Sequence, residues 1–171
     1  MTDMDFIKCI SHRISEILRF NSLAPKDISS ISGISITQIY RILSGNCDSS
    51  IRTLHKLLSC LNISLYSFFN FSLPINNLSD INSTYSLSEE LKSVAENLRI
   101  QQNKMLRING LTQEKIAEEL GYTDYRYVNY ILNGRHNTYI NIKISTLYKL
   151  SKLLGLENNI HTLFNFNLGG N

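Results

Sequence analysis

Apolar residues recur along this chain at the three- and four-residue spacing that lines one face of an α-helix. In the C-terminal half, Leu91, Val94 and Leu98 follow this spacing within a long segment, and Ser86 with Glu89 three residues later forms a capping-box start for it. Neither half shows the two-residue alternation of a half-buried strand. The pattern therefore predicts an all-α protein.

Shorter helices are predicted in both halves from cap and turn residues. Thr112 is a suitable N-cap for a helix that stops at Gly121, and Ser35 is a suitable N-cap in the N-terminal half. Residues 5–20 and 25–32 are also expected to be helical, and a leucine-rich helix closes each half. Each half is thus predicted to be a series of helices joined by short turns.

The two halves are similar in sequence. Four pairs of blocks occur in the same order: 17–35 with 105–123, 39–46 with 128–135, 51–63 with 144–156, and 68–73 with 163–168. The spacing between partners is 88, 89, 93 and 95 residues, and it increases only between predicted helices, as insertions in loops would make it do. We therefore predict two tandem five-helix domains, residues 1–73 and 86–171, joined by an Asn- and Ser-rich linker over residues 74–85.

The second copy carries a familiar pattern, "GLTQEKIAEELGYT", then "VNYILNGR", then "ISTLYKLSKLLGL". It closely resembles the Cro and phage-repressor-like (XRE) helix-turn-helix family, and the first copy resembles it less closely, with Pro25 where the family has Gln. The resemblance covers most of the chain apart from the linker. It implies domains of the lambda-repressor-like type, in a sequence-specific transcriptional regulator that binds double-stranded DNA.

The resemblance also assigns positions that read bases. In the first copy these include Thr37, Gln38 and Arg41, beside Ile36 and Tyr40; in the second copy they are Tyr125, Arg126, Asn129 and Tyr130. Arg and Asn suit the role because their side chains match the guanine and adenine edges of the major groove. The alternatives are a solvated helix face for Arg126 and Asn129, and half-buried packing rings for the tyrosines. An extra residue in the second turn leaves either Thr123 or Asp124 as the cap of the reading helix.

Contacts to DNA phosphates are expected from polar residues around the same elements. The candidates are Asn46, Ser49, Gln113, Arg135, Asn137 and Lys143. The resemblance gives Gln113 a second task, which is to brace the reading helix. The other candidates lie in predicted loops, where polar residues are also ordinary surface.

The composition is globular, with 43% hydrophobic and 18% charged residues, and the net charge of +3 permits an anionic partner without requiring one. Cys9, Cys47 and Cys60 lack metal-ligand spacing and the histidines are scattered, so we expect no metal and no cofactor. We find no nucleophile triad, phosphate-binding loop or paired carboxylates in the sequence, so we do not expect an enzyme. Because no signal peptide or membrane span is apparent, we expect a cytoplasmic, nucleoid-associated protein.

Two arrangements remain open at the level of the sequence. The resembled family commonly dimerises through its last helix, so we expect a homodimer in which both copies read DNA. The alternative is an interaction or antitoxin-type regulator, in which the first domain dimerises and only the second binds DNA. The neutral residues Ile36, Thr37 and Gln38 motivate this alternative.

Overall fold

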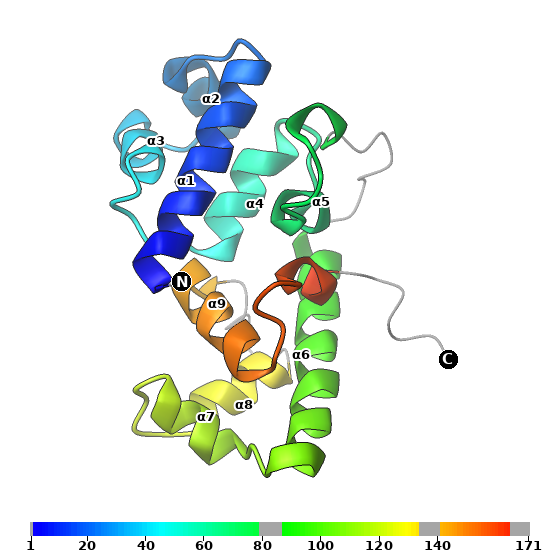
Figure 1. The fold of residues 1–171 in the computed structure, drawn as a ribbon. Helices are drawn as coiled ribbons and strands as arrows, with labels where there is room; N and C mark the ends of the chain where they lie inside the picture. The colour runs from blue at the N-terminus through cyan, green and yellow to red at the C-terminus, as the bar shows by residue number, and fades with distance from the viewer. Residues whose placement is uncertain (1, 79–86, 134–140, 165–171) are drawn as a thin grey trace.

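The computed structural model describes residues 2–78, 87–133 and 141–164, which form helices joined by short loops (Figure 1). Within these ranges no strand occurs, and one isolated antiparallel bridge pairs Ser50 with Lys143. The predicted all-α class is confirmed for this part of the chain. We refer to residues 2–78 as the first half and to the described residues from 87 to 164 as the second half.

Both halves follow the same order of elements. The first half contains α1 (Asp3–Phe20), α2 (Pro25–Ser32), α3 (Ile36–Leu43), α4 (Ile51–Ser59), α5 (Leu65–Phe69) and the 3-10 helix η1 (Ile75–Asn77). The second half contains α6 (Leu87–Asn109), α7 (Gln113–Glu119), α8 (Arg126–Leu132), α9 (Ile144–Leu153) and the 3-10 helix η3 (Ile160–Phe164). The second half therefore closes with a 3-10 helix in place of the fifth α-helix that we predicted.

The caps expected from the sequence are present. The Ser35 hydroxyl accepts a hydrogen bond from the Gln38 amide at the start of α3, and the Thr112 hydroxyl accepts one from the Lys115 amide at the start of α7. Gly33 ends α2 in the left-handed conformation, with φ of +64°, which glycine adopts without a steric cost. These residues define where the short helices begin and end.

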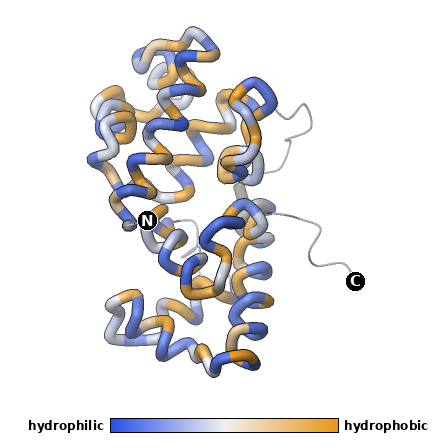
Figure 2. The backbone as a smooth tube through the Cα atoms, in the orientation of Figure 1, coloured by the Kyte–Doolittle hydropathy of each residue, from blue (hydrophilic) through white to orange (hydrophobic). Residues whose placement is uncertain are grey.

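One hydrophobic core extends through both halves. Figure 2 shows hydrophobic positions recurring along every helix between hydrophilic ones, as the sequence pattern predicted. Five aromatic side chains are among the largest that are fully buried: Phe6, Phe68, Phe69, Tyr148 and Phe164. Four of them, Phe6 with Tyr148 and Phe69 with Phe164, form ring contacts that join the two halves.

Helix α5 of the first half packs against η3, its counterpart in the second half. Phe69 of α5 and Phe164 of η3 stack with ring centroids 4.8 Å apart and an interplanar angle of 5°. Beside them, Tyr66 meets His161 edge to face, with centroids 5.5 Å apart. Figure 1 shows α5 and η3 lying next to each other between the two halves. We call all contacts between the halves the internal interface.

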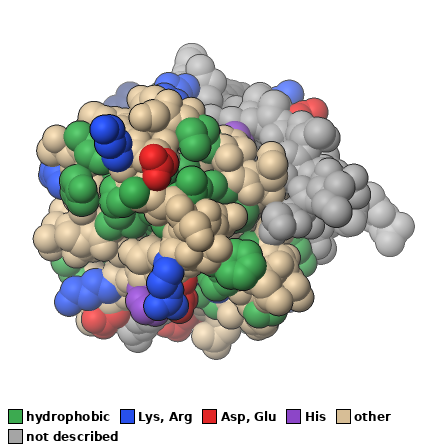
Figure 3. All heavy atoms as spheres, turned by 90° about the horizontal axis from the view of Figure 1, so that it is seen from above, with side chains coloured by type: hydrophobic (Ala, Val, Ile, Leu, Met, Phe, Trp, Pro, Cys, Tyr) green, Lys and Arg blue, Asp and Glu red, His purple; other side chains and the backbone are tan. Residues whose placement is uncertain are grey.

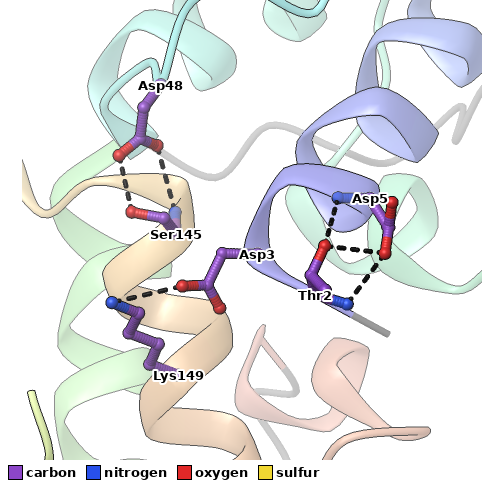
Figure 4. A network of polar contacts seen from close by, with 6 residues as sticks. All are labelled: Thr2, Asp3, Asp5, Asp48, Ser145 and Lys149. Atoms are coloured by element: carbon purple, nitrogen blue, oxygen red, sulfur yellow. Dashed lines mark hydrogen bonds and ion pairs between the residues drawn. The ribbon is translucent and has the colours of Figure 1, made fainter.

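Helix α1 of the first half packs on α9 of the second. Phe6 stacks on Tyr148 at 4.1 Å between ring centroids, and Lys149 Nζ lies 3.2 Å from a carboxylate oxygen of Asp3 (Figure 4). The Tyr148 hydroxyl also donates to Glu157, at 2.9 Å. Because the buried ring has a hydrogen-bond partner at its polar end, Tyr148 can occupy the core of this interface at little cost.

The internal interface also contains hydrogen bonds between the loops that precede α4 and α9. The Ile51 amide donates to the Ile142 carbonyl, and the Ile144 amide donates to the Ser49 carbonyl, each at 3.0 Å. Asp48 accepts hydrogen bonds from both the amide and the hydroxyl of Ser145 (Figure 4). The first half thereby supplies a cap for the start of α9, whose own N-cap residue, Lys143, makes no side-chain cap.

The start of the expected linker belongs to the packed part of the first half. Leu78 is fully buried, and Arg13 of α1 donates 3.0 Å hydrogen bonds to the carbonyls of Asn70 and Leu73. Burial lowers the pKa of the Arg13 guanidinium from its usual value. These contacts hold the segment after α5 against α1. No helix in the described ranges is long and apolar enough to cross a membrane.

Candidate nucleic-acid interface

Helices α7 and α8 form a helix-turn-helix unit in the second half. Ile116 and Ala117 of α7 are buried, and the chain turns after α7 through Gly121, whose φ is +78°. The Tyr122 amide donates to the Ala117 carbonyl at 2.8 Å, which closes the turn. Helix α8 packs against α7, and the backbone hydrogen bond shapes the turn between them.

Helix α8 has a buried face and an exposed one. Val128, Ile131 and Leu132 are at most 2% exposed, which confirms the predicted inward face. On the other side, Tyr125 is 46% exposed and the Arg126 side chain is 73% exposed. Tyr125 and Arg126 therefore point to the surface, while the opposite face of α8 packs in the hydrophobic core.

Asp124 resolves the uncertain start of α8. One of its carboxylate oxygens accepts the Arg126 amide at 2.8 Å, and the other pairs with the Arg126 guanidinium. These hydrogen bonds, led by the one from the backbone, lower the pKa of the Asp124 carboxyl, while the pairing raises the pKa of Arg126. Asp124, and not Thr123, thus closes the start of the helix, although Tyr125 holds the N-cap position. Arg126 is therefore ion-paired with its neighbour Asp124 at the surface.

Gln113 and Asn129 meet across the unit. The Asn129 amide nitrogen donates to the Gln113 side-chain oxygen at 3.0 Å, linking the first residue of α7 to the middle of α8. This contact is the brace that the resemblance implied for Gln113. The Asn129 side-chain oxygen and the Gln113 side-chain nitrogen take no part in this hydrogen bond.

The tyrosines around α8 divide into two pairs. Tyr122 and Tyr127 pack edge to face with centroids 4.7 Å apart, and burial raises the pKa of the Tyr127 hydroxyl. Tyr125 is exposed and Tyr130 is half-buried. The first pair packs ring to ring, and Tyr125 is the most exposed of the four tyrosines, at 46%.

Helices α2 and α3 occupy the corresponding positions in the first half. Ile39 and Ile42 are buried beneath α3, while Thr37 and Arg41 are exposed and Gln38 is half-buried. No described residue forms an ion pair with Arg41, in contrast to Arg126. The exposed face of α3 is also more apolar than that of α8, since Ile36 is 37% and Tyr40 57% exposed. Figure 3 looks onto the end of the molecule that carries α2 and shows hydrophobic side chains with few charged ones among them.

The residues predicted to contact phosphates differ in their exposure. Asn46 is exposed beyond α3, and Lys143 is exposed at the start of α9, although its ammonium group also donates to the Asp48 carbonyl at 3.0 Å. Ser49 is only 5% exposed and belongs to the internal interface, so its side chain is removed from the DNA-facing candidates. Arg135 and Asn137 lie outside the described residues.

Sequence reasoning missed Asp48, whose carboxylate caps α9 from the other half. The local sequence could not reveal this cap, because a capping residue is recognised next to the helix that it caps, and Asp48 lies far from α9 in the sequence. Within the described ranges, no group of three His, Cys, Asp or Glu side chains lies close enough together to hold a metal ion.

A family described as "Helix-turn-helix domain" matches residues 102–165. The match begins inside α6 and includes α7, α8, α9 and η3, so this part of the chain is similar to helix-turn-helix domains, which supports a DNA-binding role. Comparisons with curated proteins and with solved structures gave no match.

Proposed function

We propose that this protein is a sequence-specific regulator of transcription that binds double-stranded DNA through two helix-turn-helix units, α2–α3 and α7–α8. The observation that carries the proposal is the family match over the second half, together with the exposed polar face of α8 on a buried hydrophobic base. Helices of this kind enter the major groove, whose donor and acceptor pattern differs for each base pair.

The side chains of the second unit are better suited to hydrogen bonds with bases than to general electrostatic attraction to the phosphate backbone. From Thr112 to Asn133 the unit has four carboxylates against two cationic side chains, so general electrostatic attraction there is weak. Arg126 and Asn129 are the residues whose hydrogen-bonding groups match guanine and adenine edges. We assign them the direct reading of bases, and assign Gln113 a phosphate contact in addition to its brace.

The first unit is also available for DNA. Helix α3 packs on α1 and α2, whereas the internal interface is formed by other elements of the first half, chiefly α1, α5 and the loop before α4. Association within the chain therefore leaves the α3 face open. This favours two reading units over the alternative in which the first domain serves only for association.

The test is a titration with random-sequence duplex DNA at several salt concentrations, followed by a titration with a duplex selected for tight binding. The affinity is expected to fall with salt, since each phosphate contact releases counterions. Replacing Arg126 with Ala is expected to weaken binding to the selected duplex about tenfold or more. Arg99→Ala is the matched control, because Arg99 is an exposed arginine on α6, outside both units. Affinity weaker than about 10⁻⁴ M that does not respond to salt would contradict the proposal.

A further inference from the structure

Residues at equivalent positions of the two copies touch each other in the internal interface. Helices α5 and η3 are offset by 95 residues at both ends, which is the spacing of the repeated aromatic block. At this spacing Phe69 corresponds to Phe164, and these two rings stack on each other. Tyr66 corresponds to His161, and these two rings also meet.

The loop contacts follow the same rule at the spacing of their own block, 93 residues. Ser50 and Lys143 are equivalent, both are N-cap residues, and they form the isolated bridge. The hydrogen bonds on either side of the bridge are reciprocal. The residue after Ser50 donates to the residue before Lys143, and the residue after Lys143 donates to the residue before Ser50, each at 3.0 Å.

Contacts between equivalent residues, with reciprocal hydrogen bonds around them, are the signature of a twofold axis. Two tandem domains related by a translation would instead form a heterologous contact, in which different surfaces of the two domains meet. We propose that the chain is an internal dimer, which binds as a monomer to a duplex site made of two inverted but unlike half-sites. This inference rests on the proposed function for its DNA target, whereas the internal dimer rests on the interface alone.

The interface is adapted to unlike halves. Helices α1 and α6 are uninterrupted and related by a spacing of 88 residues, so Phe6 corresponds to Val94. Tyr148 corresponds to His55 at the spacing of its own block, 93 residues. The ring stack of Phe6 on Tyr148 therefore has no aromatic counterpart across the axis. Two copies of one half, paired with each other, would lose one side of this contact.

The polar contacts of the interface are equally one-sided (Figure 4). Asp3 pairs with Lys149, but the position equivalent to Asp3 is Leu91, which cannot form an ion pair. Asp48 caps α9, but the equivalent position is Asn141, which lacks a carboxylate. The first half thus fits the second half better than either half fits a copy of itself.

The short connection between α5 and α6 favours pairing within one chain. Residues joined by a short linker meet at an effective concentration in the millimolar range, far above the concentration of a second chain in a dilute solution. The expected homodimer is therefore unnecessary, since each chain already contains both partners. One chain then presents α3 and α8, whose outward residues differ at almost every reading position.

The experiment combines the mass of the free protein with selection of bound duplexes. Sedimentation equilibrium of the whole chain at micromolar concentration is expected to give the mass of a monomer. Selection from a random duplex pool is expected to enrich two different half-sites in inverted orientation, with one chain bound to each duplex. Palindromes built from either half-site alone are expected to bind about tenfold or more weakly, since one of the two reading helices would then face the wrong bases.

The outcomes separate the two proposals. A dimer in free solution, two chains on a duplex, or half-sites arranged as a direct repeat would overturn the internal-dimer inference while leaving DNA binding intact. A monomer that binds no duplex in a salt-dependent manner would overturn the proposed function and the assignment of a DNA site, while the mass measurement would still report on the internal dimer.

Discussion

Phe69 and Phe164 occupy equivalent positions in two copies of the same sequence block, and their rings stack face to face, 4.8 Å apart, between the two halves of the chain. Both side chains are almost completely buried, at 1% and 0% exposed. Residues that are repeated along the chain thus contact and bury each other in the folded protein. The two copies therefore pack as a single unit.

Removing either ring is expected to destabilise the whole protein. Phe69→Ala or Phe164→Ala should each lower the free energy of unfolding by about 3–5 kcal/mol, since each leaves a cavity in a close-packed core. Because the two rings contact each other, the double variant should lose less than the combined loss of the single variants. Urea denaturation of the three variants measures this. Phe20→Ala is the control, because the 60% exposed Phe20 should change stability by less than about 0.5 kcal/mol; fully additive losses would contradict the stack.

Asp48 is expected to stabilise a helix in the other half. Asp48→Ala should cost about 0.5–2 kcal/mol, the usual value of an N-cap, and should speed hydrogen exchange of the Ser145 amide. Asp48→Asn keeps an acceptor oxygen and should retain most of the protection. Equal exchange rates at the start of α9 in the wild type and Asp48→Ala would show that the cap contributes nothing.

The Asp124–Arg126 pair is expected to restrain DNA binding. Asp124→Asn keeps an acceptor for the Arg126 amide but removes the charge that neutralises the guanidinium, so affinity for random duplex DNA should rise and depend more steeply on salt. Binding measured at two salt concentrations checks this. An unchanged or lower affinity would show that Arg126 is not close to a phosphate or base in the complex.

The same pair gives a pH dependence at the start of α8. The pKa of Asp124 is lowered in the folded protein, first by the hydrogen bond from the Arg126 amide, so its contribution to stability is present above the usual carboxyl value of 3.8. That contribution should be lost as the pH falls from this value through the lowered pKa. Carbon-detected NMR titration of the Asp124 carboxyl, compared with Arg126→Ala, measures the shift. A titration at the ordinary value in the wild type would contradict the pairing.

Arg41 tests whether the first half reads DNA. Arg41→Ala removes the only fully charged side chain among the outward positions of α3, and we expect about a tenfold or greater loss of affinity for a selected duplex. Arg99→Ala again serves as the control. No loss with Arg41→Ala, together with a loss for Arg126→Ala, would favour the arrangement in which only the second half binds DNA.

Much of the local structure could be predicted from the sequence because its causes are local. The caps Ser35 and Thr112, the turn glycines and the buried face of α8 each follow from residues within one or two helical turns. The choice of Asp124 over Thr123 at the start of α8 could not be settled, because both residues are able to cap and an extra residue shifts the register.

The internal interface could not be predicted, because a repeat in the sequence does not say how its copies pack. In the sequence, Phe69 and Phe164 are apolar residues that could equally well fill the core of their own half. Ser49 was expected on the surface because it is a polar loop residue, yet the loop is drawn into backbone hydrogen bonds with the other half. These contacts are separated by almost a hundred residues, and no local pattern encodes them.

The most direct test of the account varies the separation of the two half-sites in a selected duplex. If the halves form one packed unit, inserting about five base pairs, roughly half a helical turn, moves one half-site to the opposite side of the duplex, and affinity should fall to that of a single half-site. An insertion of about ten base pairs should also fail, since the internal interface fixes the distance between α3 and α8. Affinity that is insensitive to both insertions would show that the halves move independently, and would contradict the internal dimer.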